Sequence, residues 1–457
     1  MLSCDTFALT RDYFSKQANA LNKNSDRPLG EAQPLIFFPA ADHAPGETLK
    51  CTHLTIDQAA HTYAMIGSQP YWIWGFEMGY NEKGLMIGNE AEGSKCEAET
   101  EEGLLGMDIL RLALERAATA REAIDVISAL LTQYGQNANA SMLFDRRYEN
   151  SFMLVDPEEI WLMETAGRQW TAKKIDSWAA ISNCYSIGTD YDLCSPGMEH
   201  LAREKRWMRP GEKVDFAKAY TAPAVRQSSS VPRWRRMLKL ISAADGALGE
   251  ADIKNILRDH FEGELIEPRF GSMFGNFVTI CMHAMTWDGS QTAASLYVYH
   301  DPVLGPVARY APSLPCCSAY IPVYFTGALP AGLSAGGGEY DENSLWWRTE
   351  RLAMLISADE ERFGQDSRSR LRSFEADVAA RAEQAEEQAR ALIAEGKKDK
   401  AFALLNQLTE RVVWEMMVLT GRLANDIVHE LRQDGGLYGL RKEFLEDYSN
   451  RCGIPLL

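Results

Sequence analysis

The stretch that decides the fold is Cys4-Asp5-Thr6-Phe7, followed at 22–28 by Asn-Lys-Asn-Ser-Asp-Arg-Pro. A thiol with an ordinary pKa near about 8.5 is mostly protonated at neutral pH, so a nucleophilic cysteine needs a base nearby. If residues 1–3 were removed, the α-amino group of Cys4, with an ordinary pKa of about 7.7–8.0, would lie beside its own sulfur. A nucleophile paired with the N-terminal amine is an established arrangement for amide hydrolysis. Cys4 is therefore a candidate nucleophile.

Further motifs follow these two stretches along the chain. They are Asn81-Glu82-Lys83-Gly84-Leu85, Ile181-Ser182-Asn183, Cys281-Met282-His283 and Trp346-Trp347-Arg348. In this order and spacing the chain resembles the secernin-like cysteine dipeptidases of the N-terminal nucleophile (Ntn) hydrolases. The resemblance runs through most of the first 350 residues, and the helical region after about residue 360 carries little of it.

The resemblance implies an α+β fold, a four-layer αββα sandwich with mainly antiparallel sheets. It implies removal of residues 1–3 as a short propeptide, a catalytic domain over 4–340 and a helical C-terminal extension over 341–457 packed on it. It also implies amide hydrolysis of a small peptide, most simply a dipeptide, through an acyl-thioester on the N-terminal cysteine. No metal and no organic cofactor are implied.

The resemblance assigns catalytic roles to five residues. Cys4 would be the nucleophile and its amine the base, and Asp26 would orient that amine, because a carboxylate favours a nearby ammonium. Asn89 and Asn183 would stabilise the oxyanion of the tetrahedral intermediate, with Asn183 in the tighter match. Arg233 corresponds to an arginine of the relatives.

A second set is expected to contact the substrate. Lys23 lies where the bile-salt-hydrolase branch carries an arginine, and a lysine does not replace its bidentate fork. Arg233 or Arg236 could anchor a substrate carboxylate. His283 lies at the end of a β-like run where it could face a pocket, although a structural role is the more common one for such a histidine. Trp72 could line an apolar side-chain pocket, with core packing as the default.

Composition excludes several classes of protein. The 457 residues are 46% hydrophobic and 24% charged, as in ordinary folded proteins, and they contain no apolar run of about 18 residues. The net charge of −17 disfavours nucleic acid and anionic membranes as partners. Nine cysteines without CxxC spacing favour a reducing cytoplasm and suggest no zinc ribbon, and the eight histidines form no HExxH motif.

Local patterns predict the main elements. The segment 151–164 predicts strand, turn, strand around Asp156-Pro157, and 170–182, 277–284 and 294–300 resemble further strands. Apolar periodicity predicts helices over 104–114 and 123–131, and then over 344–357, 367–395 and 398–433. The helical region packs on the main body in the simplest interpretation, and it also offers a surface for a homo-oligomer.

Two other functions share the same motifs. One is a non-hydrolytic, secernin-like binding or regulatory protein, in which Cys4 performs no turnover. The retained Asp26 and Asn183 favour the hydrolase, because a pure scaffold has no physical need for them. The other is an acyltransferase that passes the Cys4 thioester to an amine instead of water, which the sequence does not separate from the hydrolase.

Overall fold

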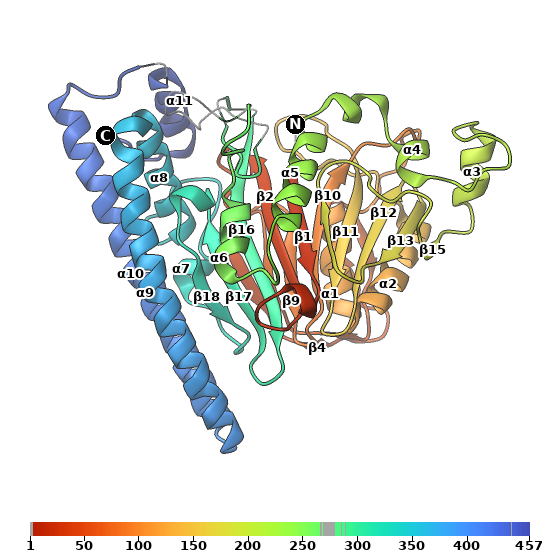
Figure 1. Ribbon diagram of the computed structural model, residues 1–457, viewed down its shortest axis with the longest axis horizontal. Helices are drawn as coiled ribbons and strands as arrows, with labels where there is room; N and C mark the ends of the chain where they lie inside the picture. Colours follow the sequence, from red (N-terminus) through yellow and green to blue (C-terminus); the bar gives the residue numbers. More distant parts are fainter. Residues whose placement is uncertain (1–2, 266, 268–278, 285, 288, 440) are drawn as a thin grey trace.

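The structure is a computed structural model that describes residues 3–265, 267, 279–284, 286–287, 289–439 and 441–457. Two antiparallel sheets form its centre (Figure 1). The six-stranded sheet has the order β14 (Trp178–Ile181), β1 (Cys4–Leu9), β2 (Ala20–Pro28), β16 (Ser290–Asp301), β17 (Gly305–Pro312) and β18 (Ile321–Tyr324). The eight-stranded sheet has the order β15 (Leu193–Cys194), β13 (Gln169–Lys174), β12 (Ile160–Ala166), β11 (Glu149–Val155), β10 (Met86–Glu92), β9 (Met78–Asn81), β8 (Met65–Ser68) and β3 (Leu35–Phe38). Two small hairpins pair β4 (Ala41–Asp42) with β7 (His61–Thr62), and β5 (Thr48–Lys50) with β6 (Thr55–Asp57).

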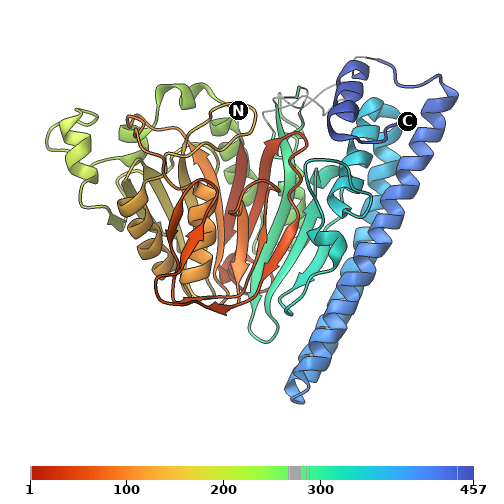
Figure 2. The same ribbon diagram turned by 180° about the vertical axis from the view of Figure 1, so that it is seen from behind.

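The two sheets pack face to face, and helices cover their outer faces (Figure 2). One apolar core between the sheets joins Ala8 and Leu21 of the six-stranded sheet to Met86 and Met153 of the other. The eight-stranded sheet buries its outer face against α1 (Gly106–Arg116) and α2 (Ala120–Tyr134). The six-stranded sheet is covered by α5 (Ser230–Ser242) and α6 (Glu250–Leu257). This confirms the expected four-layer αββα arrangement.

The strand predictions hold where a turn separates two apolar runs. Asp156 accepts the amide protons of Glu158 and Glu159, and this turn joins β11 to β12 as expected. The segment 170–182 is not one strand, because β13 lies in the eight-stranded sheet and β14 in the six-stranded sheet. Residues 279–284 are not a strand either, and 277–278 lie outside the described residues.

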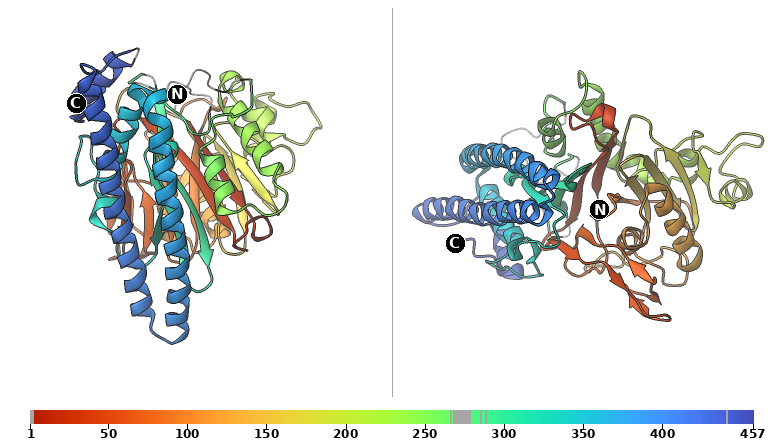
Figure 3. Two further views of the ribbon diagram at one scale, coloured as in Figure 1. Left: turned by 60° about the vertical axis from the view of Figure 1, so that its left-hand side comes forward. Right: turned by 90° about the horizontal axis from the view of Figure 1, so that it is seen from below.

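The predicted C-terminal helices are present as α8 (Leu345–Ala358), α9 (Glu360–Ala394) and α10 (Lys398–Gln433). Between the last two, Gly396 has a φ of +76°, a left-handed conformation that favours glycine at a helix end. The hairpin of α9 and α10 extends beyond the sheets (Figure 3). Its other end packs with α8 and α11 (Lys442–Cys452) around a shared apolar core. The part of the chain that the structure describes also contains three short α-helices, namely α3 (Met198–Glu204), α4 (Phe216–Tyr220) and α7 (Ala331–Ser334).

Strand β2 is unusual because all nine of its residues are buried although most are polar. Buried polar groups are costly unless they are hydrogen-bonded, so this strand needs partners from neighbouring elements. Those partners come from β1, β10 and β16 and from the segment 279–284, as described below. No helix among the described residues has both the length and the apolar character that crossing a bilayer requires.

Candidate active site around Cys4

Cys4 is the first residue of β1, and side chains along this strand alternate between the two faces of the sheet. Thr6 reaches across to the Glu90 carboxylate on β10, and Ala8 lies in the core between the sheets. Asp5 faces the other way and forms a buried ion pair with Arg233 of α5, at 2.6 Å. The Cys4 thiol therefore faces the space between the sheets.

The backbone nitrogen of Cys4 bonds to the side chain of Asn183, a residue outside the strands of its sheet. Its N–H donates to Asn183 Oδ1 at 3.0 Å, and Arg233 Nη2 donates to the same oxygen at 2.8 Å. Two donors on one atom require that atom to be the amide oxygen, which fixes the orientation of the amide. Arg233 Nη1 also donates to the Cys4 carbonyl at 3.1 Å. Asn183 and Arg233 together therefore position both ends of Cys4.

The sulfur of Cys4 lies among charged groups. The amide N–H of Asp26 donates to Sγ at 3.3 Å, and Glu77 Oε2 lies 4.0 Å from the same atom. Burial raises the pKa of the Cys4 thiol well above its ordinary value, Lys23 opposes this, and Glu90 and Glu77 add to it. With Ser3 still attached, the thiol is therefore held in its neutral form. No local motif marks Glu77, which lies just before β9, so the sequence alone gives no sign of its place beside Cys4.

The carboxylate of Asp26 lies on the Ser3 side of Cys4. It accepts Ser3 Oγ–H at 3.1 Å on Oδ2 and Thr292 Oγ1–H at 2.7 Å on Oδ1. Burial raises the pKa of this carboxyl to about 7, the nearby Asp5 adds to the increase, and Arg233 opposes it. Thr292 pairs with Asp26 across β16 and β2, a contact 266 residues apart in sequence that no motif could have suggested.

Lys23 and Asn89 meet beside this group, but not in the predicted way. Lys23 Nζ donates to the backbone carbonyl of Asn89 at 2.6 Å and to Glu90 Oε1 at 3.3 Å. Burial alone would lower the pKa of Lys23, yet the negative charges around it raise that pKa, so the ammonium stays charged. The Asn89 side chain donates to Asn150 Oδ1 at 3.1 Å, on the face of β10 opposite Glu90. The structure therefore does not bring the Asn89 amide to Cys4.

The remaining predicted residues lie apart from Cys4. Arg236 Nη2 forms an ion pair with Asp259 at 2.6 Å, and its Nη1 pairs with Glu264 at 3.1 Å. His283 is buried in an irregular segment, and its Nε2 lies 3.0 Å from His260 Nε2. Sequence periodicity misplaced it because the segment 279–284 has the composition of a strand without pairing as one.

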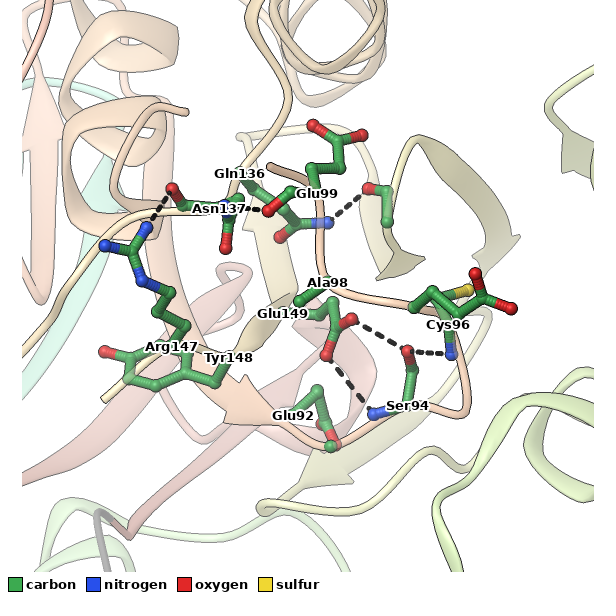
Figure 4. Close-up of a pocket in the computed structure, with 13 residues that line it drawn as sticks. Glu92, Ser94, Cys96, Ala98, Glu99, Gln136, Asn137, Arg147, Tyr148 and Glu149 are labelled. Atoms are coloured by element: carbon green, nitrogen blue, oxygen red, sulfur yellow. Dashed lines mark hydrogen bonds between the residues drawn. The ribbon is translucent and has the colours of Figure 1, made fainter. Parts of the chain in front are cut away.

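Two adjoining pockets open near Asn183. The first, of about 220 Å³, is lined by Asn183, Ala91, Arg146, Tyr148 and Ser230, among others. The second, of about 230 Å³, shares Tyr148 and is rich in carboxylates (Figure 4). Trp72 packs against the small apolar cluster to which Ala91 and Tyr148 also contribute, so it supports the wall of the first pocket.

Comparison with known proteins identifies relatives of the sequence. Residues 78–235 match the model of Peptidase family C69, a range that contains Asn89, Asn183 and Arg233. A dipeptidase of Bifidobacterium longum (strain NCC 2705) is 27% identical over 221 residues, 42% of this chain and 39% of the relative. A probable dipeptidase B of Lactococcus lactis subsp. lactis (strain IL1403) is 24% identical over 290 residues, 56% of this chain and 58% of the relative. The chain thus spans between about two fifths and three fifths of these relatives.

Among solved structures, a conjugated bile acid hydrolase from Clostridium perfringens aligns with a TM-score of 0.40 at 12% identity, covering 73% of this chain and 95% of its own. A penicillin V acylase from Agrobacterium tumefaciens aligns with a TM-score of 0.37 at 11% identity, covering 71% and 86%. The central region of the chain is thus similar to Peptidase family C69, and the chain is similar to these dipeptidases.

Proposed function

We propose that the protein is an Ntn-type cysteine dipeptidase in which Cys4 becomes the N-terminal residue. The observation that carries this proposal is that both the nitrogen and the sulfur of Cys4 accept or donate a specific hydrogen bond. Its nitrogen is bound by Asn183 Oδ1 at 3.0 Å, and its sulfur is bound by the Asp26 N–H at 3.3 Å. The N–H of any buried residue needs an acceptor, but here the acceptor is a side chain and a second N–H points at the sulfur, so both atoms that a nucleophile using its own amine must fix are held.

Removal of residues 1–3 would change the charge balance of the site. The new amine would lie beside Asn183 Oδ1 and near the Asp26 carboxyl, which Ser3 Oγ–H contacts in the chain described here. Asp26 and Asn183 Oδ1 both accept hydrogen bonds and would orient the amine, so that its lone pair can receive the thiol proton. The neutral thiol of the unprocessed chain is then the resting state that processing converts into a nucleophile.

The reaction proceeds by acyl transfer to water. The Cys4 amine takes the proton from Sγ, and the thiolate attacks the substrate carbonyl to form a tetrahedral intermediate. Asn183 Nδ2 gives one hydrogen to the Ala91 carbonyl at 2.9 Å, and its second hydrogen can stabilise the oxyanion. The amine then protonates the leaving nitrogen, and water cleaves the thioester.

The pocket beside Asn183 suits a small substrate with charged ends. Its volume of about 220 Å³ fits a few side-chain-sized groups, and Arg146 supplies a cation for a carboxylate. Lys23 and Arg233, both expected to meet the substrate, instead donate to groups of the chain itself. We assign them positioning roles, Lys23 through the Asn89 carbonyl and Arg233 through Asn183. Arg236 has no role in this mechanism.

Intact mass and N-terminal sequencing of the purified protein test the proposal first. Loss of residues 1–3, together with hydrolysis of dipeptides by the wild type and not by Cys4→Ala, would support it. Cys194→Ala is the matched control, because Cys194 is a half-buried free thiol on the small strand β15. Hydrolysis by a chain in which Ser3 is still attached to Cys4 would exclude the N-terminal amine as the base.

A further inference from the structure

A second group of chemically active side chains lies outside the Cys4 site. His260, Cys281, His283 and Cys316 are all buried, and their ligand atoms lie within 4.8 Å of one another. These four residues, the His–Cys cluster, come from three separate segments. His260 follows α6, Cys281 and His283 lie in the segment 279–284, and Cys316 lies in the short 3₁₀ turn Pro315–Cys317.

One nitrogen in this cluster has more polar neighbours than it can hydrogen-bond in its ring plane. His283 Nε2 lies 3.0 Å from His260 Nε2, 3.3 Å from Cys316 Sγ and 3.6 Å from Cys281 Sγ. An imidazole nitrogen carries one hydrogen or one lone pair, so it makes one good hydrogen bond in the ring plane. Three polar atoms around one such nitrogen therefore point to a shared central partner.

Three of the ligand–ligand distances, all involving His283, are close to those of four ligands around one zinc ion. Bond lengths of about 2.3 Å to sulfur and about 2.05 Å to nitrogen in a tetrahedron place ligand atoms about 3.3–3.8 Å apart. The two S···N distances to His283, 3.3 and 3.6 Å, lie in that range, and the N···N distance of 3.0 Å is slightly shorter. Two thiolates and two imidazoles are a standard ligand set for structural zinc, and two thiolates balance its charge.

The surroundings of the cluster are those of a metal site. His260 presents Nε2 to the cluster, while its Nδ1 lies 3.3 Å from Glu262 Oε1. A carboxylate on the far nitrogen fixes the ring and its tautomer, as is usual for metal-bound histidines. The segments are also held independently, since Cys281 N–H donates to the Asp259 carbonyl at 3.1 Å and Arg372 of α9 donates to the Cys316 carbonyl at 2.8 Å.

We infer that the His–Cys cluster binds one zinc ion through His260, Cys281, His283 and Cys316. Four protein ligands complete a tetrahedron and leave no open position, so the site is structural and not catalytic. The ion fastens the segment 279–284, in which Met282 lies between two ligands. Met282 contacts Ser3 through its sulfur, and its N–H donates to Thr292 Oγ1, the hydroxyl that binds Asp26. The zinc would thereby support the Asp26 side of the Cys4 site.

Metal analysis of the full-length protein tests this inference independently of activity. Purified wild type, dialysed against a weak chelator, is expected to retain about one zinc per chain. Replacement by Co²⁺ should give the thiolate-to-cobalt charge-transfer band and the intense visible bands of a tetrahedral site. Cys281→Ser combined with Cys316→Ser should lose both signals, whereas Cys51→Ser, a buried free cysteine in a different core, should keep them.

The measurement on the wild type tests whether the cluster binds zinc even if the double variant does not fold. Wild type that purifies without stoichiometric metal and shows no tetrahedral Co²⁺ spectrum would overturn the inference, as would a disulfide between Cys281 and Cys316 found by mass spectrometry. Retention of the ion by a folded double variant would also overturn it. Cys4→Ala should bind zinc like wild type, so the metal site can be established even if the proposed dipeptidase activity fails.

Discussion

The molecule contains two groups of buried cysteine chemistry that differ in what surrounds the sulfur. Around Cys4 the neighbours are carboxylates, a lysine and the Asp26 backbone N–H at the sulfur, and Arg233 at the carbonyl. In the His–Cys cluster the neighbours of each sulfur are other zinc-type ligands. Cys4 also has its backbone nitrogen held by the Asn183 side chain, whereas the backbone nitrogen of Cys281 is held by the backbone carbonyl of Asp259.

This difference matches the two roles proposed for these thiols. A nucleophile needs a base, a means of holding the oxyanion and an accessible face, and Cys4 lies next to a pocket that Asn183 lines. A structural ligand needs converging donors and exclusion of water, which the four buried residues of the cluster provide. Burial alone therefore does not separate the two roles, whereas the chemistry of the nearest atoms does.

The largest expected effect is the difference between a Cys4 variant and a Cys281 variant in activity and in zinc content. Cys4→Ala should lower kcat by about 10³-fold or more, because it removes the nucleophile, and should leave the zinc content at the wild-type value. Cys281→Ser should lower the zinc content and the Tm, with activity reduced through the loss of structure. Steady-state assays on a dipeptide panel and elemental analysis of the same samples provide the two readouts. If Cys4→Ala and Cys281→Ser lost zinc equally, the Cys4 site and the His–Cys cluster would form one site, and the distinction drawn between them would be wrong.

The next effect concerns the support of Cys4 by a buried ion pair. Arg233→Met leaves Asp5 buried without its cation, and removing one partner of a buried pair costs about 3–5 kcal/mol. Adding Asp5→Asn should restore at least about 1 kcal/mol, because no unpaired charge then remains. Urea unfolding of wild type and the three variants measures this cycle. A single variant Arg233→Met within about 0.5 kcal/mol of wild type would contradict the proposed support.

Sequence patterns predicted the layers of this fold better than the contacts within them. Apolar periodicity located α1, α2 and α8 to α10, because helices on the surface of a core repeat their apolar face locally. The segment 170–182 was read as one strand because both of its halves are apolar, and which sheet each half joins depends on distant partners.

The residues of the site were predicted where each lies in a recognisable short motif. Cys4, Asp26 and Asn183 do meet, whereas the Asn89 side chain lies on the wrong face, since a shift of one residue in a strand reverses the direction of its side chains. Cys281 and His283 belong to a motif, but nothing in the sequence marked them as metal ligands, because the four ligands are spread over 57 positions between His260 and Cys316. Tertiary packing brings the three segments of the cluster together, and local sequence patterns do not report on that packing.

A smaller effect is expected from pH and the Asp26 carboxyl. Burial raises its pKa from an ordinary 3.8 to about 7, so between these values the unfolded chain loses the proton while the folded chain keeps it. The stability that Asp26 contributes is therefore fully present below about pH 4 and falls as the pH rises to about 7, by at most about 1.4 kcal/mol per pH unit.

Asp26→Asn in the Cys4→Ala background isolates this effect, because that background cannot use Cys4 chemistry. Relative to its parent, the Asn variant should gain stability from pH 4 to 7 and show no further gain above about 7. Urea unfolding at intervals across this range gives the curve. A difference that stays constant with pH would mean that Asp26 is ionised throughout, and that its environment resembles the solvated carboxylates of the surface.

The smallest effect sharpens the contrast between two asparagines. Asn183 binds the Cys4 nitrogen and lines the pocket, so Asn183→Ala should lower kcat/KM by about 10²-fold or more. Asn89 contacts Lys23 and Glu77 through its backbone carbonyl and N–H, which a substitution by alanine preserves. Asn89→Ala should therefore change kcat/KM by less than about tenfold and cost about 1 kcal/mol of stability through the lost bond to Asn150. If the two variants lost activity to the same extent, the Asn89 amide would have to turn toward Cys4 during turnover, which would require it to leave Asn150 and cross to the other face of β10.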